Sequence, residues 1–333
     1  MKQVAARIFL PPPAPPLPDG RWNRYEIVFW LVPIAGFFVF PGYHVFGSQI
    51  IIAALFAVSL DLILGYARII SLGHAAYFGI GAYTAALLAK NGWNESISGL
   101  ILAGAAAAIL GFLTSFLVVR GQDLTRLMVT LGIGIMLYEA ANRASSITGG
   151  VDGLGGYTMA RLLGIFPFDL GGNTAYVYSV AVLAALFWIS RRIVNSPFGL
   201  SLRGIREGEQ RMPAIGASVT RKLVVIYIVA SAMAGLAGGL LAQTTQFVSI
   251  ETLGINRSAD AVIMLIIGGT GRLYGALVGA GVFMILQNYL AGINPVYWQF
   301  WLGLLLVLVV LFARGGLLGG LTTLLQRLGQ RSS

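Results

Sequence analysis

The sequence contains no cysteine, only two histidines and few charged residues. Asp, Glu, Lys and Arg make up 10% of its 333 residues, against ~25% in typical soluble domains. Without cysteine no disulfide can form. The nucleotide-binding pattern GxxxxGKS/T and the metalloprotease pattern HExxH are both missing. We therefore expect no ATPase site, no catalytic residues, and no metal or cofactor bound by this chain.

Hydrophobic residues account for 57% of the chain. Three uncharged runs, Ile69 to Ala89, Ser96 to Val119 and Leu170 to Ser190, are each long enough for one membrane-spanning helix, because ~20 helical residues cross the ~30 Å hydrocarbon core of a bilayer. Segments of alternating hydrophobicity, typical of membrane barrels, are not seen. The sequence therefore predicts an all-α, polytopic transmembrane bundle.

Longer uncharged runs must be divided at their turn residues. Ile27 to Leu60 contains Pro41-Gly42 and Gly47-Ser48, and Leu273 to Ala313 contains the turn at 291–295. Glycine and proline interrupt helices, so each of these two runs predicts two spans.

Further spans are expected in Leu127 to Ala141 and in Leu223 to Gln243, whereas Ala261 to Gly271 is too short to cross alone. The total is about ten helical elements over residues 27–313. A Pro-rich tail (1–26) precedes this transmembrane domain and a second tail (314–333) follows it.

The distribution of basic residues predicts the orientation. With the amino terminus in the cytoplasm and ten alternating elements, Lys90, Arg143, Arg161 and Arg257 face outward. The other 18 of the 22 Lys and Arg residues face the cytoplasm. This strong excess follows the positive-inside rule and accounts for the net charge of +10 without a nucleic-acid partner. Both tails are expected to be cytoplasmic.

The largest polar segment, residues 196–222, lies between two long apolar runs on the predicted cytoplasmic side. A charged, glycine-punctuated loop of this kind could dock a soluble partner. An ordinary solvated loop that obeys the positive-inside rule is the alternative.

Two apolar regions are interrupted by glycines, residues 65–83 near the front and residues 266–281 near the back. Small residues let membrane helices pack closely, which would explain Gly79, Gly275 and Gly279. Breaks in both halves of a chain also indicate a transport pathway, because unwound backbone is tolerated where it lines a cavity. The sequence leaves both interpretations open.

Four ordered motifs carry a family resemblance. They are SLGHAAYFGIGAY (71–83), RGQDLTRLMVTLG with TGGVDGLGG (120–132 and 148–156), the segment from GLSLRGIREGEQRMPAIG onward, and IIGGTGRLYGALVGA (266–280). Together the motifs resemble the inner-membrane permeases of bacterial ABC importers for branched-chain amino acids, over roughly residues 50–312. The resemblance implies multi-pass insertion in the bacterial inner membrane. It also implies four partners: a second related permease, two cytoplasmic ATP-binding subunits, and a periplasmic solute-binding protein.

In that family the position of the 196–222 segment implies a coupling helix that docks on the ATPase. Leu200, Leu202, Ile205 and Met212 can form its apolar face, and Arg203, Arg206, Glu207 and Arg211 a charged face toward the partner. Gln210-Arg211-Met212 departs from the EAA signature of many importers, whereas Gly216 fits its glycine. Pro213 is expected to end a helix. The predicted coupling residues are Leu200, Arg203, Arg206, Glu207, Arg211 and Gly216.

Asp61 is the strongest candidate for a functional residue within a membrane span, since ionisable groups in the membrane are costly and often functional. Arg68, seven residues on, would lie on a similar helix face, so a structural ion pair explains both residues as well as a pathway role does. His74 is expected to be a packing histidine rather than a metal ligand. Glu139 could line a pathway or reach the outer interface. The predicted pathway residues are Asp61, Ser71, His74, Tyr77, Glu139, Gly268, Gly269 and Thr270.

Two functions remain at this stage. The first is the permease subunit of an ABC importer that moves branched-chain or other hydrophobic amino acids, energised by ATP-binding partners. The alternative is a self-sufficient channel or ion-coupled transporter for urea, an amide or another small solute. The charged segment 196–222 favours the first, because a channel has no need of it.

Overall fold

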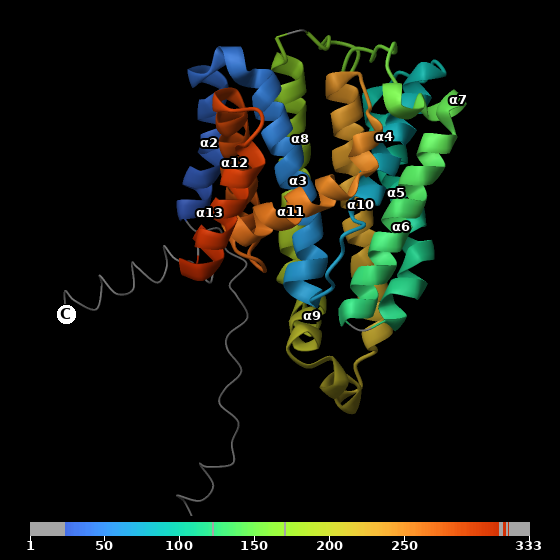
Figure 1. The fold of residues 1–333 in the computed structure, drawn as a ribbon, viewed down its shortest axis with the longest axis vertical. Helices are drawn as coiled ribbons and strands as arrows, with labels where there is room; N and C mark the ends of the chain where they lie inside the picture. The colour runs from blue at the N-terminus through green and yellow to red at the C-terminus, as the bar shows by residue number, and fades with distance from the viewer. Residues whose placement is uncertain (1–23, 122, 170, 313–315, 318, 320–333) are drawn as a thin grey trace, which may run out of the picture.

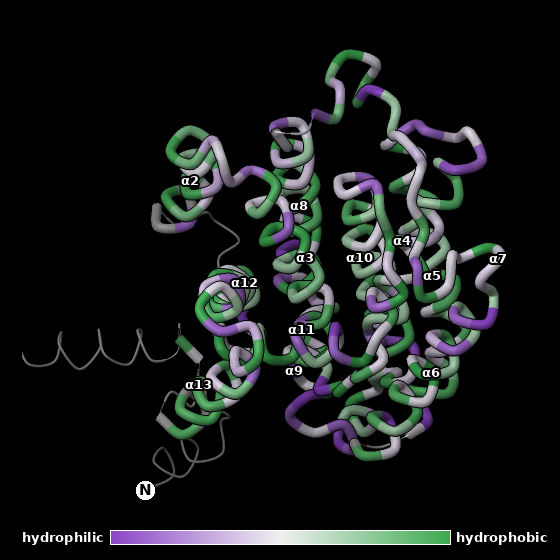
Figure 2. Tube along the Cα trace, turned by 45° about the horizontal axis from the view of Figure 1, so that its top comes forward, coloured by the Kyte–Doolittle hydropathy of each residue, from purple (hydrophilic) through white to green (hydrophobic). Residues whose placement is uncertain are grey.

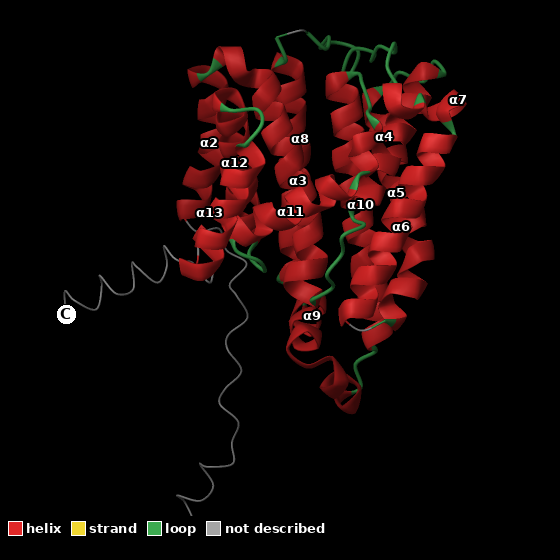
Figure 3. Ribbon diagram, viewed as in Figure 1, coloured by secondary structure: helices red, strands yellow, loops and turns green. Residues whose placement is uncertain are grey.

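The computed structural model describes residues 24–121, 123–169, 171–312, 316, 317 and 319. The two predicted tails fall almost entirely outside these residues. The described residues form twelve α-helices and no β-strand, which confirms the all-α prediction (Figure 3). Six helices, α3, α5, α6, α8, α10 and α12, are long and apolar enough to cross a membrane. The helix bounds are α2 (Arg24–Val39), α3 (His44–Ala67), α4 (Ala75–Lys90), α5 (Ser96–Arg120), α6 (Asp123–Arg143), α7 (Ser145–Thr148), α8 (Asn173–Val194), α9 (Pro197–Gly208), α10 (Val219–Thr245), α11 (Ile255–Gly268), α12 (Leu273–Ile293) and α13 (Trp298–Phe312).

The long helices run side by side, with α9 at one end of the bundle and α7 at the other (Figure 1). We call these the α9 end and the α7 end. Hydrophobic residues dominate the long helices, whereas hydrophilic residues gather in the connections (Figure 2). Helix α3 is the centre of the core: 89% of its most apolar window is buried. A helix that is apolar on all sides is expected in such a position.

Some predicted breaks are confirmed and others are wrong. Pro41 opens a short 3-10 turn, Pro41–Tyr43, between α2 and α3, and α12 ends at Ile293 before α13 begins. The break predicted at Gly47-Ser48 does not occur, and α3 continues through it. There the ring of Tyr176 from α8 occupies the space that a Cβ of Gly47 would need. That glycine therefore serves close helix packing rather than a turn.

The predicted span Ile69 to Ala89 is also wrong in its first third. Residues 68–74 are not helical, and α4 begins only at Ala75. Arg68 ends α3 in a left-handed conformation with φ of 57°. Gly73 then passes so close to the Thr130 carbonyl of α6 that no Cβ would fit.

A matching arrangement occurs in the second half of the chain. Helix α10 ends at Thr245, and the next residue, Gln246, is also left-handed with φ of 53°. Residues 246–254 turn back into the bundle from the α7 end before α11 begins (Figure 1). Residues 68–74 do the same from the α9 end. We call residues 68–74 with α4 the first re-entrant segment and residues 246–254 with α11 the second. The two short helices that follow meet inside the bundle, where the Ala75 N–H donates to Ser258 Oγ at 2.8 Å. Interrupted helices of opposite direction that meet midway are typical of transporter folds.

The packing interpretation of the three glycines is confirmed. A Cβ at Gly79 would collide with Leu253, one at Gly275 with the Gly269 carbonyl, and one at Gly279 with the Met264 carbonyl. These glycines allow α4 and α12 to approach the residues around α11 at backbone distance.

Candidate functional site: a coupling junction and a membrane cavity

The predicted coupling segment contains a helix with its own start and stop signals. Ser196 caps α9 by accepting the Gly199 N–H at 3.3 Å, and Pro197 occupies the first turn, as both residues favour. The α-helix ends at Gly208. A 3-10 helix, η3 (Glu209–Ile215), follows and contains Pro213. The helix end expected at Pro213 is therefore wrong, because the α-helix already stops at Gly208 and the 3-10 helix continues past the proline.

The apolar face of α9 and η3 was predicted correctly at three of four positions. Leu202, Ile205 and Met212 are buried. Leu200 is 41% exposed and faces away from the bundle. The exposed surface also includes Glu207, Arg211 and Ile215, the last 75% exposed. The surface offered to a partner is therefore mixed, with apolar side chains beside charged ones.

Two of the arginines predicted to face a partner also contact the end of α3. Arg206 Nη1 donates a hydrogen bond to the Gly65 carbonyl, and the Arg203 guanidinium lies 5.6 Å from the centre of the Tyr66 ring. The physical reason is that the last carbonyls of an α-helix lack intrahelical partners and attract cations. Arg206 is still exposed and Arg203 partly exposed, so both arginines hold α9 to α3 while remaining on its accessible surface.

Gly216 closes the segment in the left-handed region, with φ of 77°. This conformation accounts for a glycine at the position where Gly216 fits the family signature. A Cβ there would meet no neighbour within 4 Å, so the requirement for glycine comes from the backbone conformation alone.

An ion pair that the sequence did not suggest holds η3 to the bundle. Arg126 of α6 donates to Glu209 at 2.7 Å, with 3% of the arginine side chain and 41% of the glutamate side chain exposed. The coupling segment is therefore fixed to α3 through Arg206 and to α6 through Glu209.

Asp61 lies on α3, fully buried. Its Oδ1 accepts the Gly271 N–H at 2.7 Å, and Gly271 belongs to the break between α11 and α12. The predicted ion pair with Arg68 does not form. Because Arg68 is left-handed, the chain leaves the helix there and the same-face relation seven residues on is lost.

Four residues meet at this point: Asp61, Gly65, Arg206 and Gly271, which we call the coupling junction. A Cβ at Gly65 would collide with Asp61 and with the Gly271 backbone, and one at Gly271 would lie 2.6 Å from Arg206 Nη1. Gly271 also has φ of 77°. The junction brings α9, the end of α3 and the α11–α12 break into direct contact.

The other predicted pathway residues do not form one cluster, and they differ in burial. Gly268 and Gly269 are buried beside the junction, whereas Thr270 and Glu139 are exposed. Ser71 is buried in the 68–74 segment.

His74 and Tyr77 are held inside the protein. His74 Nε2 and Ser59 Oγ share a hydrogen bond of 2.9 Å, in accord with the expected packing role. The Tyr77 hydroxyl lies 2.7 Å from the Thr114 hydroxyl and 2.9 Å from that of Tyr227, which ties α4 to α5 and α10.

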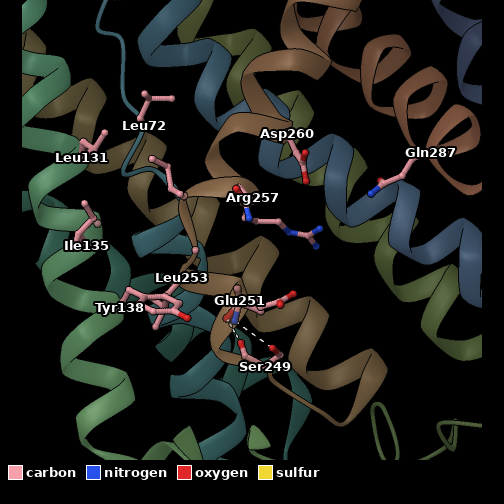
Figure 4. Close-up of a pocket in the computed structure, with 15 residues that line it drawn as sticks. Leu72, Leu131, Ile135, Tyr138, Ser249, Glu251, Leu253, Arg257, Asp260 and Gln287 are labelled. Atoms are coloured by element: carbon pink, nitrogen blue, oxygen red, sulfur yellow. Dashed lines mark hydrogen bonds between the residues drawn. The ribbon is translucent and has the colours of Figure 1, made fainter. Parts of the chain in front are cut away.

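A cavity of about 550 Å³ opens between α6, α11 and α12, and Figure 4 shows its lining. None of the predicted pathway residues lines it. Its charged and polar residues come mainly from the second re-entrant segment, and the sequence-based prediction missed them: Ser249, Glu251, Asn256, Arg257, Asp260 and Gln287. The available signal was Arg257 and Asp260 inside an otherwise apolar run, but Arg257 was counted only as an outward-facing charge.

The chain matches the protein family described as "Branched-chain amino acid transport system / permease component" over residues 46–310. It belongs to this permease family. The permease protein LivM of the high-affinity branched-chain amino acid transport system of Salmonella typhimurium is 27% identical over 81% of this chain and 68% of that protein. The Escherichia coli protein of the same name is 27% identical over 79% of this chain and 67% of its own length.

The chain also matches permeases whose names refer to other solutes. The ribose import permease protein RbsC of Bacillus subtilis is 31% identical over 36% of this chain and 39% of its own length. No solved structure matches this permease. The matched region contains both re-entrant segments, the coupling junction and the cavity.

Proposed function

We propose that this permease is the membrane subunit of an ABC importer for branched-chain or similar hydrophobic amino acids, and that separate subunits hydrolyse the ATP. The family match over residues 46–310 supports the class of protein. The names of the LivM relatives support the solute. The single observation that supports energy coupling is the coupling junction, because it connects the surface helix α9 directly to the break between α11 and α12.

Coupling would work through rigid contacts. A partner that binds the exposed side of α9 and η3 and then moves would displace α9. Because Arg206 is hydrogen-bonded to Gly65, that displacement would also move Gly65 and the adjoining Gly271. The α11–α12 break is packed against α3 with no room for a Cβ at Gly65, so it would move with α3. Interfaces packed this tightly switch between arrangements rather than deform gradually.

The proposed partners are two cytoplasmic ATP-binding subunits at the α9 end, a second related permease, and a periplasmic solute-binding protein at the α7 end. We place the protein in the bacterial inner membrane, with both termini cytoplasmic. The basic residues of the described chain support this orientation. Helices have basic residues in their first or last turn at the α9 end, as the positive-inside rule expects of a cytoplasmic face: Arg120, Arg191, Arg192, Arg221 and Lys222.

Reconstitution tests the proposal. The permease is co-purified with ATP-binding subunits and a second permease from its own organism, placed in vesicles, and supplied with a soluble binding protein and radiolabelled L-leucine. Uptake is expected only with ATP inside the compartment that the α9 end faces. Uptake that persists without any ATP-binding subunit would instead establish the channel or ion-coupled alternative.

A further inference from the structure

The cavity between α6, α11 and α12 has two chemically different walls. Leu131 and Ile135 of α6, with Leu72, form an apolar side, while Glu251, Arg257 and Asp260 contribute charge from the other side (Figure 4). Its volume of about 550 Å³ falls within the ~300–1,000 Å³ typical of small-molecule sites. A solute that fits both walls has an apolar body and a charged head.

The charged wall has few partners in the protein itself. Within the described part of the chain, Glu251, Arg257 and Asp260 form no ion pair and no side-chain hydrogen bond. The Arg257 guanidinium lies 5.4 Å from the centre of the Phe78 ring, and Arg257 and Asp260 attract each other electrostatically without forming an ion pair. Charges inside a membrane protein are costly unless they serve a pathway or a ligand. Glu251 is exposed, whereas Arg257 and Asp260 are only partly exposed. The head groups of Arg257 and Asp260 therefore keep hydrogen-bonding capacity for a ligand in the cavity.

Arg257 and Asp260 are three residues apart on α11 and so lie on one face of the helix. Figure 4 shows the Arg257 guanidinium reaching into the cavity, with Asp260 on the same side. One helix face thus presents a positive and a negative group side by side, without the two neutralising each other by direct contact. A carboxylate fits the forked guanidinium, and an ammonium fits the carboxylate.

We propose that this cavity binds a zwitterionic solute during passage, with Arg257 recognising its carboxylate and Asp260 its ammonium group, while Leu72, Leu131 and Ile135 contact its apolar side chain. The inference deepens the proposed function and rests on it for the transport direction. It assigns α-amino acid recognition to the re-entrant helix α11 rather than to the coupling junction.

A binding measurement that needs no transport tests the assignment. Because the chain has no native cysteine, Asn256→Cys, which lies in the cavity lining, gives this chain a single reporter thiol, whose alkylation is read on the permease band of the assembled complex. Its alkylation is timed with L-leucine, with leucinamide, which lacks the carboxylate, and with 4-methylpentanoate, which lacks the ammonium. L-leucine should slow alkylation at roughly tenfold lower concentration than either analogue.

The two charge variants should fail in opposite ways. In the Asn256→Cys background, Arg257→Gln should abolish the preference for leucine over leucinamide and keep the preference over 4-methylpentanoate. Asp260→Asn should do the reverse. Arg143→Gln and Asp152→Asn remove exposed charges outside the cavity and should change neither preference. If Arg257→Gln does not assemble, Arg257→Lys, which keeps the charge, should assemble and retain the preference over leucinamide.

Equal protection by the three compounds in the unaltered cavity would overturn the proposal. So would variants that lose assembly with the second permease but keep leucine protection, since the charges would then serve the subunit interface. A complex that shows the two preferences without ATP-driven leucine uptake would contradict the proposed function while leaving the cavity assignment intact.

Discussion

Arg206 of α9 donates a hydrogen bond to the carbonyl of Gly65 at the end of α3. One turn earlier in α3, Asp61 holds Gly271 by a second hydrogen bond, of 2.7 Å. The surface helix α9 and the break between α11 and α12 are therefore both hydrogen-bonded to the last turns of α3. Cutting either hydrogen bond should separate partner docking from solute movement.

Arg206→Ala should uncouple the importer. The ATP-binding subunits should still associate, because Leu200, Glu207 and Arg211 remain on the exposed surface, and ATP hydrolysis should persist. Leucine uptake should fall by roughly tenfold, the equivalent of losing one charge-assisted hydrogen bond of ~1.5 kcal/mol. Hydrolysis and uptake are measured in the same vesicles.

Arg211→Ala is the matched control, since Arg211 is exposed on the partner-facing side. It should weaken subunit association and so reduce hydrolysis and uptake together. Identical ratios of uptake to hydrolysis in the two variants would contradict a coupling role for Arg206.

Gly271→Ala should destabilise the permease. Its φ of 77° costs an L-residue ~1–2 kcal/mol, and the added Cβ would crowd Arg206. Gly281→Ala in α12 is the control, because a Cβ there meets nothing within 4 Å and alanine favours helix. Thermal unfolding in detergent should show a lower midpoint for Gly271→Ala alone.

Asp61 tests whether charge or hydrogen bonding matters at the junction. Asp61→Asn keeps an acceptor oxygen for the Gly271 N–H, whereas Asp61→Leu leaves that N–H unpaired at a cost of ~1–3 kcal/mol. We expect the asparagine variant to fold. The leucine variant should unfold at a lower temperature, or at a lower denaturant concentration, than the unaltered permease. Adding Arg68→Gln should rescue neither, because Arg68 does not pair with Asp61.

Transport separates the two roles of Asp61. If the hydrogen bond to Gly271 is its function, Asp61→Asn should take up leucine at close to the normal rate. A folded, fully assembled Asp61→Asn permease without uptake would show that the negative charge itself is needed.

Local signals in the sequence were sufficient for several features of this fold. Pro41 and the 291–295 turn mark real helix ends, and Gly216, which fits the glycine of the family signature, has a positive φ. Gly47 could not be interpreted correctly in the same way, because its role depends on Tyr176, far along the chain. Short-range chemistry thus predicts where backbone must turn, while packing between distant helices decides which glycines are only spacers.

The same limit applies to the site. That residues 196–222 contain an amphipathic helix was predictable, but the direction of Arg203 and Arg206 depends on where α3 ends. That end is set by the left-handed Arg68, a conformation uncommon for a residue other than glycine. The Arg257 and Asp260 pair was visible in the sequence, yet only the fold shows that α11 enters from the α7 end and turns both side chains into a cavity.

Orientation is tested by placing single cysteines at opposite ends of the bundle. Gln210→Cys lies on the exposed surface of η3 and Ser146→Cys on α7, and both positions are exposed. With the α9 end in the cytoplasm, an impermeant maleimide added to intact cells should label position 146 and leave position 210 unmodified until the membrane is permeabilised. The absence of native cysteine makes any labelling attributable to the introduced residue. Labelling of position 210 from outside would reverse the orientation, and would place α9 where cytoplasmic ATP-binding subunits cannot reach it.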